Sequence, residues 1–166
     1  MKKKILLVLL FVGAIIYAQE QPSFSDTSAN TKEITTRYFN DYIALDFEAM
    51  QPLMDNDISF NDATAKLIFG IELVEGKTQV VENFKKTYAA IVEMKSEVIR
   101  TLFSSNVGVF EIQLTYKFKV ETGKTITIKK MPLIVILTVK DDKISEHRDY
   151  GDYNHFLEQY KKQSNQ

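Results

Sequence analysis

The segment KISEHRDYGD, residues 143–152, contains the side chains of this chain that are best suited to acid/base chemistry. It follows MPLIVILTVK, residues 131–140, which is almost wholly apolar. Alternate side chains of a strand share a face, so His147 and Asp149 are expected to lie side by side with Ser145. The opposite face would then carry Ile144, Glu146, Arg148 and Tyr150.

Two interpretations of His147 and Asp149 stay open at this point. A carboxylate beside an imidazole in an apolar pocket can serve as a general acid/base pair. Alternatively, the two side chains form a hydrogen-bonded pair that only orders the end of the strand, because structural ion pairs are also common.

The elements that would position this segment follow from the hydrophobic periodicity. A first helix is expected from a cap at Asn30 or Thr31, with Tyr38 and Tyr42 on its apolar stripe. A short helix, FEAMQPLM, follows the cap residue Asp46. A third helix is expected from Thr78 to about Glu93, and its buried stripe would contain Val81, Phe84, Tyr88, Ile91 and Val92.

Strands are predicted at residues 58–62, 96–103, 109–118, 124–140 and 143–150. The strand at 109–118 alternates strictly between apolar and polar residues, which is typical of a half-buried antiparallel strand. Pro132 is expected to mark a bulge or an edge. Helices gathered on one side of a curved antiparallel sheet give a cone-shaped α+β domain, with a cavity at its wide end.

Composition narrows the possible partners of the chain. It has 166 residues, a formal net charge of −1, two histidines and no cysteine. Without a basic face, a nucleic-acid partner is not expected. The sequence also lacks a metal-binding motif and a glycine-rich phosphate loop, so neither a metal nor another cofactor is predicted.

The N-terminal residues have the pattern of an export signal. MKKK is followed by an apolar run that ends in a small residue, which predicts a signal peptide at 1–18 cleaved near Ala18. The alternative is an uncleaved membrane anchor. Residues 19–30 are then expected to form a flexible leader, 31–162 the domain and 163–166 a tail. The mature protein would be periplasmic or extracellular.

Three stretches together resemble the nuclear transport factor 2-like (cystatin-like) fold and, within it, the SnoaL-like proteins. They are TRYFNDYIALDFEAMQPLMDNDISFND at 36–62, EGKTQVVENFKKTYAAI at 75–91 and KISEHRDYGDYNHFLEQY at 143–160. The run I-x-E-x-R-D-Y-x-D at 144–152 is their most specific part. The resemblance implies a cone with about three helices packed on the concave side of its sheet, often dimeric through the open face of that sheet.

The resemblance also implies roles for individual residues. Asp149 matches the aspartate that works as acid or base in the SnoaL-like polyketide cyclases and in limonene epoxide hydrolase. That hydrolase also needs an Arg-x-Asp pair on a neighbouring strand, which the strand at 109–118 lacks. A ketosteroid isomerase needs tyrosine and carboxylic acid donors. Asp62 is a candidate for that acid, or it is only a turn residue.

We therefore expect a cavity lined by Tyr38, Tyr42, Phe60, Asp62 and Tyr88, with Asp149 and His147 as the candidate catalytic pair. The leading hypothesis is that the cavity binds a small apolar or aromatic molecule. The first alternative is an isomerase, cyclase or lyase that uses Asp149 with His147. The second is a dimeric interaction module, which would use the outer sheet face with Glu111, Gln113, Thr115 and Lys117.

Overall fold

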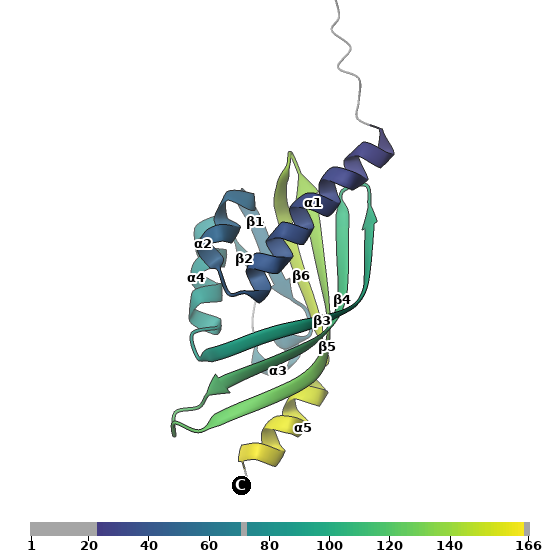
Figure 1. Cartoon of the computed structure of the whole chain (residues 1–166). Helices are drawn as coiled ribbons and strands as arrows, with labels where there is room; N and C mark the ends of the chain where they lie inside the picture. Colours follow the sequence, from purple (N-terminus) through teal and green to yellow (C-terminus); the bar gives the residue numbers. More distant parts are fainter. Residues whose placement is uncertain (1–22, 71–72, 165–166) are drawn as a thin grey trace, which may run out of the picture.

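The computed structural model describes residues 23–70 and 73–164, which form a curved sheet with helices on its inner side (Figure 1). The predicted signal peptide lies outside these residues. The six strands have the order β2-β1-β6-β5-β4-β3. They are β1 (Met54–Asp62), β2 (Val74–Glu75), β3 (Ile91–Ser104), β4 (Val107–Lys119), β5 (Thr125–Lys140) and β6 (Lys143–Gly151).

Five α-helices and one 3₁₀ turn occur in the described residues, somewhat more than the three helices expected. They are α1 (Phe24–Ile43), α2 (Phe47–Met50), η1 (Gln51–Leu53), α3 (Ala65–Phe69), α4 (Lys77–Thr87) and α5 (Tyr153–Ser164). α1 and α4 lie against the inside of the curved sheet, α2 packs on α1 and α4, and α5 packs on β5 (Figure 1). The α+β cone predicted from the sequence is confirmed as an open, curved sheet covered by helices.

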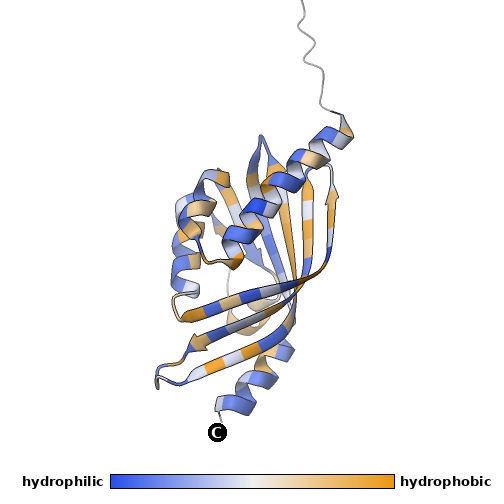
Figure 2. Ribbon diagram, in the orientation of Figure 1, coloured by the Kyte–Doolittle hydropathy of each residue, from blue (hydrophilic) through white to orange (hydrophobic). Residues whose placement is uncertain are grey.

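The core forms between the inner face of the sheet and the apolar stripe of α1. Along β4, the expected alternation buries Phe110, Ile112 and Leu114. Phe39 of α1 stacks on Phe110 with the ring centroids 4.2 Å apart. Apolar and polar residues alternate along the strands in Figure 2. Burial of one face therefore fixes which side chains of β4 point inward.

α1 begins earlier than predicted, so a flexible leader reaching to residue 30 is wrong for residues 24–30. Ser23 caps the helix, because its hydroxyl accepts a hydrogen bond from the Asp26 amide at 3.2 Å. Further along, Ser28 accepts from the Ser105 amide, and Asn30 donates to Asp142. These long-range contacts hold the first two turns of α1 against the strand ends. The spacing of apolar residues in the sequence cannot predict such contacts.

The ends of two other elements also differ from expectation. α4 stops at Thr87, and Ile91 already belongs to β3, where it pairs with Phe118 of β4. Val92 consequently points outward and is exposed, although it was predicted on the buried helical stripe. α5 runs through the predicted tail to Ser164, held by two hydrogen bonds between Gln163 and the backbone of Thr127.

The sheet is mixed and not wholly antiparallel. β1 runs parallel to β6, with Asp62 opposite Asp149. β6 also has a bulge, because Thr138 pairs with Glu146 while Val139 pairs with Ile144, which leaves Ser145 as the extra residue. The predicted alternation is therefore wrong at Ile144, which is buried together with His147 and Asp149.

A second bulge bends β5 near its middle. Leu114 of β4 pairs with Met131, whereas Tyr116 pairs with Ile128, so Lys129 and Lys130 share one partner position. Lys130 has a positive φ of 52°, and its amide donates to Thr115. Pro132 itself pairs regularly with Gln113 inside the sheet, so the bulge predicted there lies instead at Lys129 and Lys130. Bulges increase bending, which suits a sheet that curls around a cavity.

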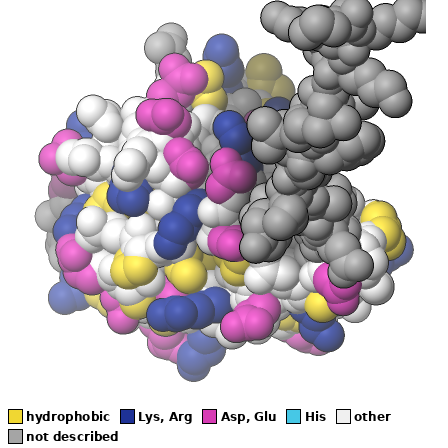
Figure 3. Space-filling model, turned by 90° about the horizontal axis from the view of Figure 1, so that it is seen from above, with side chains coloured by type: hydrophobic (Ala, Val, Ile, Leu, Met, Phe, Trp, Pro, Cys, Tyr) yellow, Lys and Arg dark blue, Asp and Glu magenta, His cyan; other side chains and the backbone are white. Residues whose placement is uncertain are grey.

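Charges are mixed on the part of the surface seen in Figure 3. Acidic and basic side chains alternate over this face, and neither sign forms a continuous patch there. Among residues 23–70 and 73–164, no helix combines the length and apolarity that crossing a membrane requires.

Candidate functional site

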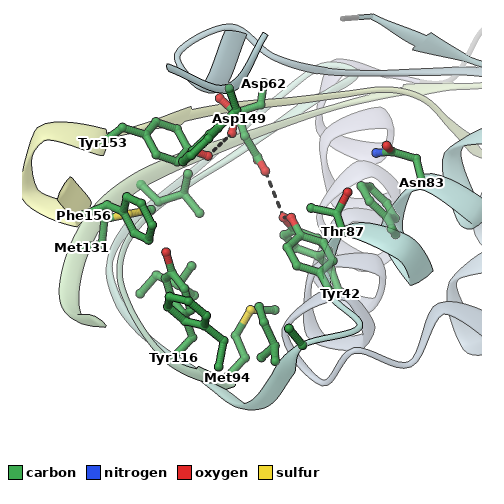
Figure 4. A pocket seen from close by; sticks show the side chains of 18 of the residues that line it. Tyr42, Asp62, Asn83, Thr87, Met94, Tyr116, Met131, Asp149, Tyr153 and Phe156 are labelled. Carbon is green, nitrogen blue, oxygen red and sulfur yellow. Dashed lines mark hydrogen bonds between the residues drawn. The ribbon is translucent and has the colours of Figure 1, made fainter. Parts of the chain in front are cut away.

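A cavity of about 290 Å³ lies between the inner face of the sheet, α4 and the start of α5 (Figure 4). This volume is at the lower end of the range for small-molecule sites, about 300–1,000 Å³. Its wall is mostly aromatic and aliphatic, with Asp62 and Asp149 at one end and Tyr116 and Met94 facing them (Figure 4). The lining residues are Tyr42, Phe60, Asp62, Phe69, Asn83, Phe84, Thr87, Tyr88, Ala90, Ile91, Met94, Leu114, Tyr116, Phe118, Met131, Leu133, Asp149, Tyr153 and Phe156.

Asp149 is the deepest charged group of the cavity. Only 2 % of the residue is exposed, and the β6 strand places it between His147 and Tyr42. His147 Nε2 lies 2.9 Å from one carboxylate oxygen, and the Tyr42 hydroxyl donates to the other oxygen at 3.0 Å. The predicted neighbourhood of His147 and Asp149 therefore exists.

His147 does not line the cavity, in contrast to the expected acid/base partner on the cavity wall. It is completely buried, and four aromatic rings surround its imidazole at centroid distances of 4.8–5.7 Å. These rings belong to Tyr38, Tyr42, Phe60 and Phe84. The imidazole can thus reach a ligand only through Asp149, which makes it a positioning group for that carboxylate.

Hydrogen bonding determines which nitrogen of His147 carries the proton. The Tyr38 hydroxyl lies 3.2 Å from Nδ1, and no other acceptor for this hydroxyl is present in the described part of the chain. If Tyr38 donates to Nδ1, then Nε2 bears the hydrogen and donates to Asp149. This arrangement gives the Tyr38 hydroxyl and both nitrogens of His147 a hydrogen-bond partner, as is usual for buried polar groups.

Tyr38 lies one layer behind the cavity wall, although it was expected to line the cavity. It is fully buried and contacts Asp149 only through His147. Tyr42 and Tyr88 do line the cavity, and their hydroxyl oxygens are 2.6 Å apart. Burial, and next the charge of Asp149, raises the pKa of both hydroxyls, so they remain protonated donors near neutral pH.

Asp62 caps a turn, as one of the two interpretations expected, and its side chain also lines the cavity. One carboxylate oxygen caps the turn after β1, accepting from the Thr64 and Ala65 amides at 3.1 and 2.7 Å. The other oxygen accepts from the Tyr153 hydroxyl. Burial raises the pKa of Asp62, and nearby Asp149 adds to the increase, although the Tyr153 hydrogen bond opposes it. Adjacent strands are about 5 Å apart, so the two aspartates form a close pair.

Several cavity residues had no signal in the sequence. Tyr153 and Phe156 come from α5, and Tyr116 and Phe118 come from β4. All four line the cavity. Phe60, in contrast, is found on the wall as predicted. The missed residues come from elements far apart in sequence, so only the folded sheet brings their rings together.

The described residues contain no cluster of three or more His, Cys, Asp or Glu side chains that could hold a metal ion. The second histidine, His155, lies on α5, where its Nε2 is 2.8 Å from the Lys129 carbonyl oxygen.

The comparisons with known proteins agree on the fold. The SnoaL-like domain family matches residues 35–147, more than half of the chain, and the match ends two residues before Asp149. A search of curated proteins gave no match.

Solved structures of similar shape share little sequence with the chain. A candidate SnoaL-like polyketide cyclase from Shewanella putrefaciens CN-32 is 17 % identical, with a TM-score of 0.71 over 80 % of this chain and 97 % of that one. A second from Shewanella denitrificans OS-217 is 16 % identical, with a TM-score of 0.71 over 80 % and 98 %. An LEH-like epoxide hydrolase from M. tuberculosis is 11 % identical, with a TM-score of 0.61 over 79 % and 89 %.

Proposed function

Because this chain belongs to the SnoaL-like domain family, we propose that its cavity binds a small, largely apolar or aromatic molecule. The observation that carries the proposal is the cavity itself. Its wall is formed mostly by rings and aliphatic side chains. Its two carboxylates lie at one end, together with the hydroxyls of Tyr42 and Tyr153 that donate to them. Apolar pockets with a few convergent polar groups are the usual form of a ligand site.

A neighbouring pair of residues on β3 provides the test. Ile91 lines the cavity, while Val92 points away from it and is exposed. We expect Ile91→Trp to weaken binding of the neutral fluorophore N-phenyl-1-naphthylamine by about tenfold or more, because overpacking costs about 1–3 kcal/mol. Val92→Trp should bind like the wild type. Fluorescence titration measures both, and equal binding by all three proteins would place the probe outside the cavity.

A second candidate function is acid/base catalysis of the isomerase, cyclase or lyase type. It is supported by Asp149, a buried carboxylate that faces the cavity and is held by two donors. Tyr116 faces the same cavity, and no protein acceptor for its hydroxyl is present among the described residues (Figure 4). Burial raises the pKa of Tyr116, so this hydroxyl stays protonated and can donate to an oxygen of the ligand.

In this second function, Asp149 takes a proton from the ligand or returns one, and His147 and Tyr38 keep the carboxylate in place from behind. Epoxide hydrolysis of the limonene epoxide hydrolase type is not supported, because β4 offers Ile112, Gln113 and Leu114 where an Arg-x-Asp pair would be needed.

We further propose that the chain forms a homodimer through the outer face of the sheet. Ile99, Ile134 and Tyr150 are exposed there, and all three line a shallow groove on that face. Such apolar patches favour association. Export through the N-terminal signal stays a prediction.

Sedimentation analysis tests the dimer. The wild type is expected to have the mass of two chains, and Ile99→Lys the mass of one, because a buried lysine would lose its hydration. Leu67→Lys, which adds the same charge to an exposed leucine of α3, should leave the dimer intact. A monomeric wild type would refute the proposal.

A further inference from the structure

We infer that the ligand of this cavity is a small organic cation, a protonated amine or quaternary ammonium group on an apolar body. This inference rests on the proposed function, because it specifies the charge of the molecule that the cavity binds.

The first observation is the sign of the charges on the wall. Asp62 and Asp149 face the cavity, and no lysine, arginine or histidine lines it among the described residues. The donors that hold the two carboxylates are hydroxyls, backbone amides and the imidazole of His147. Hydroxyls and amides add no positive charge, and neither does the imidazole when its Nδ1 accepts the hydrogen bond from Tyr38. The inner end of the cavity is therefore negative.

The second observation is a continuous aromatic wall that begins beside Asp62 at Tyr153 and extends across the cavity to Tyr116. Phe69 of α3 contacts Tyr153 and Phe156 of α5, at centroid distances of 5.5 and 5.7 Å. Phe156 contacts Phe118 of β4 at 6.3 Å, and Phe118 contacts Tyr116 at 6.0 Å. Three elements thus supply five rings to one wall, and aromatic faces attract cations within about 6 Å of their centroid.

Together these features discriminate between ligands of different charge. An anion would lose its hydration and meet two carboxylates in a region that excludes most water, where like charges repel strongly. A neutral molecule would gain only apolar burial and leave the charge of Asp149 without a counterion. A cation with an apolar body gains the same burial and interacts favourably with the carboxylates and the rings.

Two small molecules of the same shape, one cationic and one neutral, test the inference on the wild-type protein. Phenyltrimethylammonium and tert-butylbenzene have nearly the same shape and differ by one positive charge. Each is titrated against the N-phenyl-1-naphthylamine complex, and displacement of the fluorophore is followed. We expect the cation to bind about tenfold more tightly or better, the range that a desolvated cation–π contact provides.

Two aspartate variants locate the source of the preference. Asp149→Asn is expected to reduce the preference for the cation at least several-fold. Asp57→Asn removes an equivalent charge from an exposed position of the same sheet and should behave like the wild type. For each variant, the affinity for phenyltrimethylammonium is divided by the affinity for tert-butylbenzene. A loss of stability would lower both affinities and leave this ratio unchanged.

The outcomes separate the two proposals. If tert-butylbenzene displaces the fluorophore as well as the cation does, or if neither displaces it, the inferred charge is wrong while binding in the cavity stands. If the fluorophore fails to bind the wild type at all, and neither isostere binds by direct calorimetry, the proposed cavity function itself fails.

Discussion

Asp149→Asn is expected to slow proton exchange on a cyclic ketone by about 10²–10⁴-fold, the usual contribution of a positioned general acid or base. The probe is 2-tetralone in D₂O, a bicyclic ketone small enough for a cavity of about 290 Å³. In the wild type, Asp149 would take the proton next to the carbonyl while Tyr116 donates to the oxygen. Proton NMR follows the loss of signal with time.

The asparagine variant should keep the fold, because the hydrogen bonds around it can reverse and only the Tyr38 hydroxyl hydrogen loses its acceptor. The Tyr42 hydroxyl can donate to the new amide oxygen. If the amide nitrogen then donates to Nε2 of His147, the imidazole proton moves to Nδ1 and points at Tyr38. A matching circular dichroism spectrum checks this, and Asp57→Asn serves as the control for exchange. Wild-type exchange no faster than buffer, or an unaffected variant, would eliminate the catalytic candidate.

His147→Leu is expected to lower the free energy of unfolding by about 1–3 kcal/mol for each buried group that it leaves without a partner, namely one Asp149 oxygen and the Tyr38 hydroxyl. His147 is completely buried, so water cannot replace its hydrogen bonds. Leucine fills much of the space that the four aromatic rings surround, but it offers no hydrogen-bond donor to Asp149 and no acceptor to Tyr38. Urea unfolding measures the change.

A double-mutant cycle with Tyr38→Phe distinguishes the network from simple packing. The single Tyr38→Phe variant should cost about 1–2 kcal/mol, because His147 Nδ1 loses its donor. In the His147→Leu background the same change should cost little or become favourable, since it removes an orphaned hydroxyl. Additive costs would show that the Tyr38–His147 hydrogen bond contributes nothing of its own.

The cone and much of its cavity were predictable from local patterns. Strict alternation along β4 identified the residues that face the core, and helical spacing placed Tyr38 and Tyr42 on the buried stripe of α1. Both predictions succeed because one face of each element is buried. Apolar residues therefore recur in the sequence with the period of the helix or the strand. The RDY run also identified Asp149 as a candidate cavity residue.

The ends of the helices were predicted less accurately from the sequence, because long-range contacts determine where each helix begins and ends. α1 begins at Phe24, where contacts of Ser28 and Asn30 with distant strand ends favour the helix. α4 ends early because Ile91 finds a partner in Phe118. In both cases the deciding partner lies tens of residues away along the chain.

The amino-acid sequence by itself determined which residues of this protein could be buried and which acid/base groups it possesses. Only the tertiary structure decided their roles. The bulge at Ser145 turns both Ile144 and His147 inward, and the parallel pairing of β1 with β6 puts Asp62 beside Asp149. Strand register and pairing depend on the packing of the whole sheet, so one short segment cannot specify them. That packing encloses His147 in aromatic rings and leaves Asp149 facing the cavity.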